Sequence, residues 1–315
     1  MNNIQIFNLR SETGFCVDVL SLGGIITKIM AKDCHGLRQN VVLKYEDYAD
    51  YYNNSLFLGC ITGPIAGRTK NGQIHVNNII INLDTSCHPN SLHCCNEGLH
   101  LINWRPISQS DTHVTLETES TNYGATVSYQ ITYRLKAESL TLETYVTTSQ
   151  PIYLSITNHS YFNLTGDAGL TIDNHLLKLN ATHVASLDHE CLPLSLEPIE
   201  TTLYDFTHTR TINAKSVAID HPFKLSNGLH VAELKEPISR RQMTIKTTQP
   251  YMVVYTGNFL ESYTSKSGKL FKNHTGICFE TQDLPNITNN NLDQVAVVTP
   301  DKPYNHSTSF EFTTY

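Results

Sequence analysis

Polar and apolar side chains alternate along several separate stretches of the chain. The longest regular stretch runs from Thr126 to Leu135, and similar alternation recurs at 114–117, at 140–143 and around 244–246. Successive side chains of a β-strand point to opposite faces, so a period of two is typical of strands with one buried face. Turn residues separate these stretches, as in antiparallel strands that follow one another in sequence. The pattern therefore predicts an all-β fold with long antiparallel sheets.

Signals for helices are sparse. The stretch from Tyr45 to Tyr52, which carries three acidic residues, is expected to form a short surface helix. Between 69–70 and 73–76, the pair Asn71-Gly72 predicts a two-residue hairpin turn, because both central positions of such a turn need positive φ. Strands do not alternate with helices, so a dinucleotide-binding fold is not expected.

Length and composition indicate one globular unit. The chain has 315 residues, of which 40% are hydrophobic, enough to bury a sizeable core. Its 16 glycines and 12 prolines are scattered, and no low-complexity or like-charge run marks a linker. All-β folds beyond about 200 residues commonly form one domain, so we expect a single domain over residues 1–315.

The charge balance limits the possible partners. Lys and Arg number 22 against 29 Asp and Glu, a net charge of −7, and no local Lys/Arg stripe offsets it, so a nucleic-acid partner is not expected. Only 16% of residues are charged, which leaves a surface of hydroxyls and amides suited to neutral polyols. The sequence shows neither a secretory signal pattern nor a long apolar run. We expect a cytoplasmic protein without membrane contact, as a monomer or homodimer.

Cysteines and histidines raise the question of a disulfide or metal centre. Eight cysteines, at positions 16, 34, 60, 87, 94, 95, 191 and 278, lack framework spacing, so free thiols are expected. His88, His93, Cys94, Cys95 and His100 fall within a short span, but CxxC pairs and HExxH are absent. We therefore expect no metal site. Phosphate-binding glycine loops are also missing, so no nucleotide cofactor is expected.

One histidine lies at the end of a predicted strand. Ile152, Leu154 and Ile156 alternate with more polar residues, and His159 falls with the polar set. This pattern places the imidazole off the apolar face, where its ordinary pKa of about 6.5 allows proton exchange at neutral pH. A surface or structural histidine is the alternative interpretation.

A glutamate lies in a second predicted strand. Ile277 and Phe279 take one face of that strand, and Cys278 and Glu280 take the other. Partial desolvation by apolar neighbours would raise the pKa of the carboxyl group and make it a better proton acceptor. The alternative is a solvated strand glutamate without a chemical role.

Four segments resemble the aldose 1-epimerase, or galactose mutarotase, family. Residues 157–164 (TNHSYFNL) are similar to a family motif with the same letters, and residues 276–282 (GICFETQ) resemble the family's GxCxETQ signature. Residues 89–93 (PNSLH) and 255–259 (YTGNF) are similar to two further family segments. The order and rough spacing fit from about Val17 to the C-terminus, so the resemblance covers essentially one full-length domain.

The resemblance implies a large antiparallel β-sandwich, often called a supersandwich, and an isomerase that interconverts the α and β anomers of a free aldohexose such as galactose or glucose. It implies that Glu280 is the catalytic base and His159 the acid. By the same resemblance, Arg68, His93 and Asp220 would hold the sugar. Because no electron or group leaves the substrate, the reaction requires no cofactor or metal. Read without the resemblance, Arg68 is a surface arginine and Asp220 a turn residue.

The chain departs from the family pattern near these positions. Pro64 and Gly67 replace an arginine and an asparagine of the family's GRxANR segment, and Cys94-Cys95 stand where two glycines are typical. Val253 stands where many relatives have a sugar-contacting glutamine. These differences leave the loop shape and the preferred sugar open.

Three other functions fit parts of the pattern. An epimerase for another sugar or for a hexose phosphate is one, although a phosphate would need extra cations near the site and the sequence shows no obvious cluster. A carbohydrate-binding protein without turnover is disfavoured because His159 and Glu280 are both present. A glycosidase ordinarily needs two carboxylates that flank the scissile bond.

Overall fold

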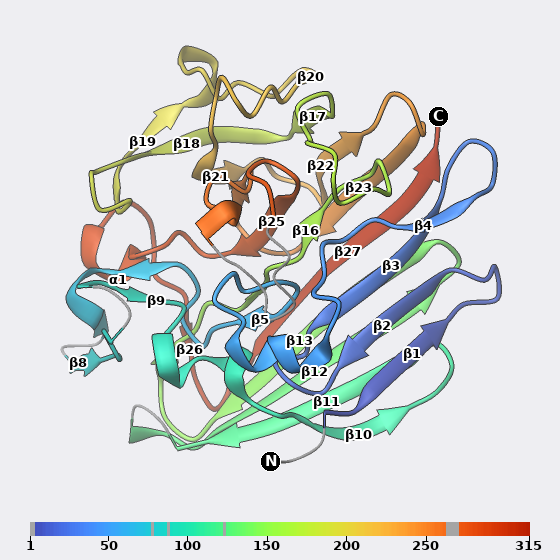
Figure 1. Cartoon of the computed structure of the whole chain (residues 1–315). Helices are drawn as coiled ribbons and strands as arrows, with labels where there is room; N and C mark the ends of the chain where they lie inside the picture. Colours follow the sequence, from blue (N-terminus) through green and yellow to red (C-terminus); the bar gives the residue numbers. More distant parts are fainter. Residues whose placement is uncertain (1–3, 77–78, 87–88, 122–123, 263–270) are drawn as a thin grey trace.

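The computed structural model describes residues 4–76, 79–86, 89–121, 124–262 and 271–315, and antiparallel strands dominate it (Figure 1). The largest sheet has nine strands, in the order β10 (Arg105–Gln109), β11 (His113–Ser120), β12 (Val127–Lys136), β13 (Ser139–Thr148), β27 (Tyr304–Thr314), β23 (Arg241–Thr247), β22 (His230–Lys235), β17 (Leu176–Leu179) and β20 (Arg210–Thr211). A second sheet has six strands, in the order β16 (Tyr161–Phe162), β25 (Ile277–Gln282), β24 (Tyr251–Tyr255), β21 (Asp220–Leu225), β18 (Ala181–Leu187) and β19 (Pro193–Pro198).

Smaller sheets and short helices complete the described part of the chain. Four strands form a meander of β1 (Ile6–Arg10), β2 (Cys16–Leu20), β3 (Ile26–Lys32) and β4 (Arg38–Asn40). Four strand pairs are β5 (Ile61–Thr62) with β15 (Thr157–Asn158), β6 (Arg68–Thr69) with β9 (Ser91–Leu92), β7 (Gln73–Val76) with β8 (Ile79–Asn82), and β14 (Ile152–Tyr153) with β26 (Val297–Val298). The helices are α1 (Ile287–Asn290) and the 3-10 helices η1 (Tyr48–Asn53), η2 (Lys70–Gly72), η3 (Cys95–Glu97), η4 (Leu99–Leu101), η6 (Ile199–Thr201) and η7 (Leu260–Ser262).

The two large sheets pack against each other through apolar side chains. Buried and partly exposed positions alternate along β12, as the sequence pattern predicts. Phe310 of β27 contacts Phe162 of β16 with ring centroids 5.0 Å apart, and Phe162 also contacts Phe279 of β25 at 6.3 Å. These contacts join the nine-stranded sheet to the six-stranded one within one core cluster. The prediction of an all-β antiparallel sandwich is confirmed.

The four stretches of alternation correspond to β11, β12, β13 and β23 in the large sheet. Register follows the hydrophobic pattern, since Leu116 of β11 lies opposite Ile131 of β12, and Tyr133 of β12 lies opposite Leu142 of β13. Apolar residues therefore line up on the same face across neighbouring strands, which is the arrangement that a buried sheet face requires.

The turn at Asn71-Gly72 is only partly as predicted. Both residues have positive φ, 52° and 62°, as expected. However, the strand before the turn, β6, pairs with β9, and the strand after it, β7, pairs with β8. The prediction of a hairpin between 69–70 and 73–76 is therefore wrong, because the turn redirects the chain from one strand pair to another.

Two other local predictions also change in the folded chain. The surface helix expected at 45–52 is the shorter 3-10 helix η1, which begins after Asp47, whose side chain accepts a hydrogen bond from the backbone N–H of Ala49. The strand predicted upstream of His159 consists of the short strands β14 and β15, and residues 152–164 are buried on both faces. The polar set that includes His159 faces the interior, not solvent.

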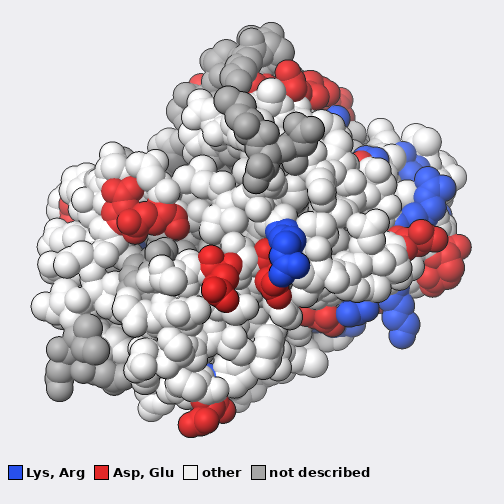
Figure 2. Space-filling view, turned by 90° about the horizontal axis from the view of Figure 1, so that it is seen from below, with Lys and Arg blue, Asp and Glu red and all other residues white. Residues whose placement is uncertain are grey.

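Uncharged side chains make up most of the molecular face in Figure 2, and its described Lys and Arg side chains form small separate groups among acidic ones. This face offers no extended basic stripe within the described residues. Among the helices of the described ranges, none has the length and apolar character needed to cross a membrane.

Candidate active site

A cavity of about 220 Å³ lies against the six-stranded sheet. The five residues that the sequence singled out all line it, and they come from separate elements: Arg68, His93, His159, Asp220 and Glu280. Positions as far apart in the chain as 68 and 280 thus meet in one cavity. The fold therefore brings every predicted site residue together.

Three adjacent strands form the floor of this cavity. In one row of direct neighbours, Asp220 of β21 lies opposite Tyr255 of β24, which lies opposite Cys278 of β25. In the next row, Pro222 lies opposite Val253, which lies opposite Glu280. Residues two apart on a strand share a face, so both rows face the same side of the sheet. Asp220 and Glu280 therefore face the same cavity. Asp220 lies on strand β21 and not in a turn.

Backbone hydrogen bonds fix His159 beside the floor. Its N–H donates to the carbonyl oxygen of Cys60 at 2.8 Å, and its carbonyl oxygen accepts from Gly59 N–H at 3.0 Å. The neighbouring Asn158 side chain donates to the Gly59 carbonyl oxygen at 2.8 Å. The segment 59–60 thus holds the main chain on both sides of the imidazole.

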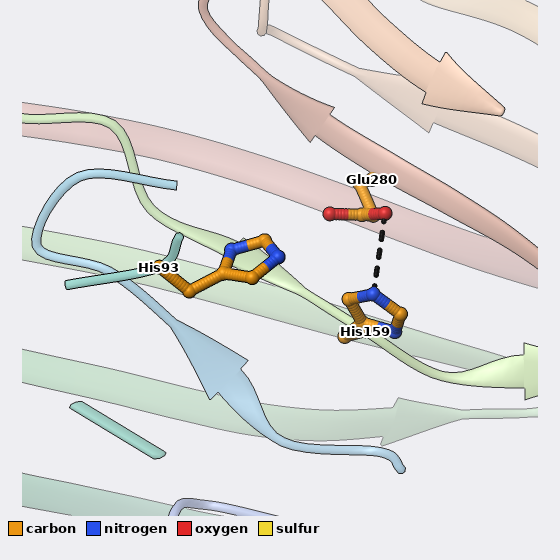
Figure 3. A group of neighbouring side chains, drawn as sticks. All are labelled: His93, His159 and Glu280. Atoms are coloured by element: carbon orange, nitrogen blue, oxygen red, sulfur yellow. Dashed lines mark ion pairs between the residues drawn. The ribbon is translucent and has the colours of Figure 1, made fainter. Parts of the chain in front are cut away.

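His159 and Glu280 form a close pair of titratable groups in the cavity. Nε2 of His159 lies 3.4 Å from Oε1 of Glu280, and the two side chains point toward each other (Figure 3). Only 5% of His159 and 4% of Glu280 is exposed. The other ring nitrogen, Nδ1, lies 3.5 Å from the Sγ of Cys278. A proton can therefore be held by either member of a pair with little access to bulk water.

Burial shifts the two pKa values in opposite directions. It raises the pKa of Glu280 to about 8, with a further increase from the Asp220 carboxylate and a decrease from Arg68. It lowers the pKa of His159 to about 4. Desolvation disfavours the charged form of each group, which explains both directions. The rise at Glu280 confirms the prediction from its apolar neighbours, whereas the prediction of an ordinary pKa for His159 is wrong, because its polar neighbours are themselves buried.

Arg68 is the cation of the cavity lining and acts on both carboxyl groups. Its guanidinium lowers the pKa of Asp220 and of Glu280, while burial raises both. Arg68 lies on β6 and is half-buried. A half-buried guanidinium opposite two carboxyl groups can donate hydrogen bonds to hydroxyl oxygens without leaving the carboxylates uncompensated.

His93 presents a hydrogen-bond donor to the cavity. The backbone N–H of Gly67 donates to Nδ1 of His93 at 3.1 Å. Because a backbone N–H can only donate, Nδ1 must be unprotonated, and the proton of the neutral ring lies on Nε2. Burial is the main cause of the lowered pKa of His93, so the ring is neutral at pH 7. One ring nitrogen points toward His159 and Glu280 (Figure 3).

The same tautomer bears on metal binding. Ligand atoms of His93, His159 and Glu280 lie within 4.8 Å of one another, a spacing that a metal ion could bridge. A histidine ligand offers a lone pair to the metal and donates its other N–H to a neighbour. His93 has the reverse arrangement, since its outer nitrogen accepts from Gly67. The three residues therefore suit a sugar oxygen better than a metal ion.

Comparison with known proteins agrees with this geometry. The family model described as "Aldose 1-epimerase" matches residues 5–311. The chain belongs to the aldose 1-epimerase family. The galactose mutarotase of Rattus norvegicus is 30% identical over 98% of this chain and 94% of its own length. The aldose 1-epimerase of Haemophilus influenzae is 27% identical over 90% of this chain and 88% of its own. Family membership makes this protein an isomerase.

Solved structures of other aldose epimerases share the fold. An aldose epimerase homologue from C. elegans matches with a TM-score of 0.92 at 20% identity and covers 99% of both chains. Galactose 1-epimerase from Lactobacillus acidophilus matches with a TM-score of 0.84 at 24% identity, over 99% of this chain and 98% of that one. At these identities the likeness shows the fold, which is the sandwich predicted from the sequence.

The structure explains two departures from the aldose 1-epimerase pattern. A Cβ on Gly67 would lie 2.9 Å from Pro285, and Gly67 has φ of 79°, so glycine fits where relatives have asparagine. Cys94 and Cys95 have φ of 63° and 45°. They therefore keep the left-handed backbone that glycines adopt readily, and His93 remains at the cavity.

One cysteine prediction is wrong. Cys95 is disulfide-bonded, whereas Cys16, Cys34, Cys60, Cys94, Cys191 and Cys278 are thiols outside any disulfide, as expected. Cys87 and His88 lie outside the described residues. Spacing alone could not reveal the disulfide, because it depends on how loops meet in space.

Three aromatic residues of the epimerase site received no role from the sequence. Tyr161 and Tyr255 contact the His159 ring at centroid distances of 5.0 and 6.3 Å, and both lie in segments that resemble the family. Phe57 contacts it at 5.8 Å. The two tyrosines could have been found by their place in the motifs, but no sequence signal marks Phe57.

Proposed function

We propose that this protein interconverts the α and β anomers of a free aldohexose such as galactose or glucose, with Glu280 as base and His159 as acid. The observation that carries the proposal is the 3.4 Å approach of His159 Nε2 to Glu280 Oε1 in a buried cavity. A base and an acid at this separation can act on two oxygens attached to the same carbon, as the hydroxyl and ring oxygens of a cyclic aldose are.

In the proposed reaction, Glu280 takes the proton of the C1 hydroxyl while His159 gives a proton to the ring oxygen. The bond between C1 and the ring oxygen breaks, and an open-chain aldehyde forms. Rotation about the C1–C2 bond presents the other face of the aldehyde. Closure returns one proton from Glu280 to the C1 oxygen and another from the former ring oxygen to His159, so the enzyme is unchanged and no electrons are lost or gained.

The pKa shifts support this division of labour. Ring opening moves one proton from His159 to the sugar and another from the sugar to Glu280. A lowered pKa makes protonated His159 a stronger acid, and a raised pKa makes ionised Glu280 a stronger base. Both shifts therefore favour proton transfer in the ring-opening direction once the one proton of the pair lies on His159 and Glu280 is ionised. Each general acid or base contributes roughly 10²–10⁴-fold to such reactions.

The sugar-holding roles of Arg68, His93 and Asp220 remain part of the proposal. Arg68 supplies guanidinium donors, His93 supplies an N–H, and Asp220 accepts from hydroxyls. The described lining has Arg68 as its one Lys or Arg, beside two carboxyl groups. A doubly charged phosphate would find a single cation there, one that already acts on both carboxyl groups, which favours a free sugar over a hexose phosphate.

Polarimetry of freshly dissolved α-glucose and α-galactose tests the proposal. The purified protein should speed the approach to anomeric equilibrium of at least one of these sugars in proportion to its concentration. No acceleration of either sugar would remove the proposed function. We also propose a single domain over residues 1–315, working in the cytoplasm as a monomer or homodimer, which sedimentation of the purified chain and fractionation of cells can check.

A further inference from the structure

The ring of Phe57 contacts three histidines at the edge of the cavity. Its centroid lies 4.7 Å from that of His93, 4.9 Å from that of His100 and 5.8 Å from that of His159. The rings of His93 and His159 also contact each other at 5.6 Å. Phe57, His93 and His159 therefore form a triangle of mutual contacts, and Phe57 lines the cavity itself.

The backbone of Phe57 has an unusual conformation for its residue type. Its φ is 56°, in the left-handed region that bulky residues rarely occupy. Such conformations are energetically unfavourable and persist where the surroundings impose them. Two residues later, Gly59 N–H donates to the His159 carbonyl oxygen, and His159 N–H donates to Cys60. One short segment thus contacts both the ring and the main chain of His159.

An aromatic hydrocarbon at this place restricts what the imidazole can do. Phe57 has no hydrogen-bonding group, so the nitrogens of His159 keep Glu280 and Cys278 as their neighbours. Its bulk also keeps water from this side of the ring. Burial is the largest cause that lowers the pKa of His159, and removing this ring would reduce that burial. The titratable groups around His159 are Glu280, Cys278, Tyr161, Tyr255, His93 and His100.

We propose that Phe57 is a positioning residue that holds the rings of His159 and His93 in place beside Glu280 and excludes water from His159. This inference rests on the proposed function. A purely structural role is the alternative. Phe57 is only partly buried at the margin of its hydrophobic cluster, and its backbone is strained, so packing alone is a weak reason for phenylalanine at this position.

Two substitutions separate the roles. Phe57→Ala should lower kcat about 10- to 10²-fold, because small displacements of a catalytic group carry such costs. Water should then reach His159 and raise its pKa. The acidic limb of the pH profile of kcat/KM should therefore move to higher pH by about one unit. Phe57→Leu keeps an apolar side chain at the same strained position, so it should recover most of kcat and keep the wild-type limb.

The control is Tyr48→Ala, which removes a partly exposed aromatic side chain from η1, outside the described cavity lining, and should leave kcat and the profile unchanged. Wild-type kcat and pH profile in Phe57→Ala would overturn the inference. Equal losses of kcat in Phe57→Ala and Phe57→Leu, with the acidic limb of kcat/KM at its wild-type pH, would also overturn the inference. Such a result would reflect packing alone.

An NMR titration of the His159 ring, assigned by comparison with His159→Asn, gives a readout without substrate. The His159 pKa should rise in Phe57→Ala and stay in Phe57→Leu. If the wild-type protein accelerates no aldose, the proposed function fails, but this titration still decides whether Phe57 shields His159. An unchanged His159 pKa in Phe57→Ala would refute the shielding even in an active enzyme.

Discussion

Asp220 raises the pKa of Glu280 from across one intervening strand. The two carboxyl groups face the same cavity from β21 and β25, with Tyr255 and Val253 of β24 between them. Arg68 opposes the effect, since it lowers the pKa of both groups. The residue that we assign to sugar binding therefore also tunes the proposed base.

Replacing Asp220 by Asn should change both binding and pH dependence. The amide is a poorer acceptor for sugar hydroxyls, so KM should rise. Loss of the negative charge lowers the pKa of Glu280, so the alkaline limb of kcat/KM should move to lower pH, by up to about one unit. A pH series of polarimetric rates measures both. Wild-type values of KM and of the alkaline limb would show that Asp220 is only a structural strand residue.

The substitution Glu280→Gln should abolish most activity and stabilise the fold at alkaline pH. Turnover should fall by about 10²-fold or more because the amide cannot accept the proton. The pKa of Glu280 rises from 4.5 to about 8 on folding, so the native state binds this proton more tightly and loses stability as pH rises between those values. Glutamine cannot ionise, so the variant should exceed wild type in unfolding free energy at pH 8 by about 1 kcal/mol or more.

Urea unfolding at pH 5 and pH 8 measures that difference for Glu280→Gln, and Glu143→Gln, at a half-exposed position of β13 outside the described cavity lining, provides the control. The control should match wild type in activity. Near-wild-type rates in Glu280→Gln would exclude the carboxyl group from proton transfer.

For His159→Asn we expect a loss of turnover of about 10²-fold or more, because asparagine donates a hydrogen bond but cannot carry the proton. The wild-type kcat/KM profile should be bell-shaped, since the His159–Glu280 pair holds one proton between its two titrations. In the variant only Glu280 titrates, and it must be ionised to act, so the rate should rise with pH through the pKa of Glu280 and the alkaline limb, which reports loss of the pair's one proton, should disappear. A variant that keeps its rate and that limb would show that another group protonates the ring oxygen.

Gly67→Ala should disturb the loop that presents His93. The new Cβ would lie 2.9 Å from Pro285, and φ of 79° is unfavourable for alanine. We expect a loss of about 1–2 kcal/mol from the backbone conformation, a further loss from the contact, and a higher KM as His93 shifts. Thermal unfolding and KM measure these effects.

Gly14→Ala is the matched control for that substitution. Gly14 has φ of 81°, but a Cβ there meets nothing within 4 Å. It should therefore show the conformational loss alone, with KM unchanged. Equal stability and KM changes in the two variants would contradict the role of the Gly67–Pro285 contact.

Local sequence determined the strands and their faces. The alternation from Thr126 to Leu135 predicts β12, because side-chain direction in a strand depends only on position along that strand. The same reasoning separated Ile277 and Phe279, which enter the main core, from Cys278 and Glu280 on the cavity side. Motifs that resemble the family supplied Arg68, His93, His159, Asp220 and Glu280.

Tertiary structure decided which faces are buried and which strands pair. Asn71-Gly72 have the predicted φ, yet β6 and β7 take partners elsewhere in the chain. The alternating pattern places His159 with the polar side chains of its strand. In the folded chain, contacts with Cys60, Cys278 and Glu280 bury it, and burial lowers its pKa. Phe57 reaches the site through a left-handed backbone that no neighbouring residue signals. Periodicity is set by residues a few positions apart. Desolvation and strand pairing depend on residues far away in the sequence, such as Cys278, which lies 119 positions from His159. Only the folded chain brings those residues together.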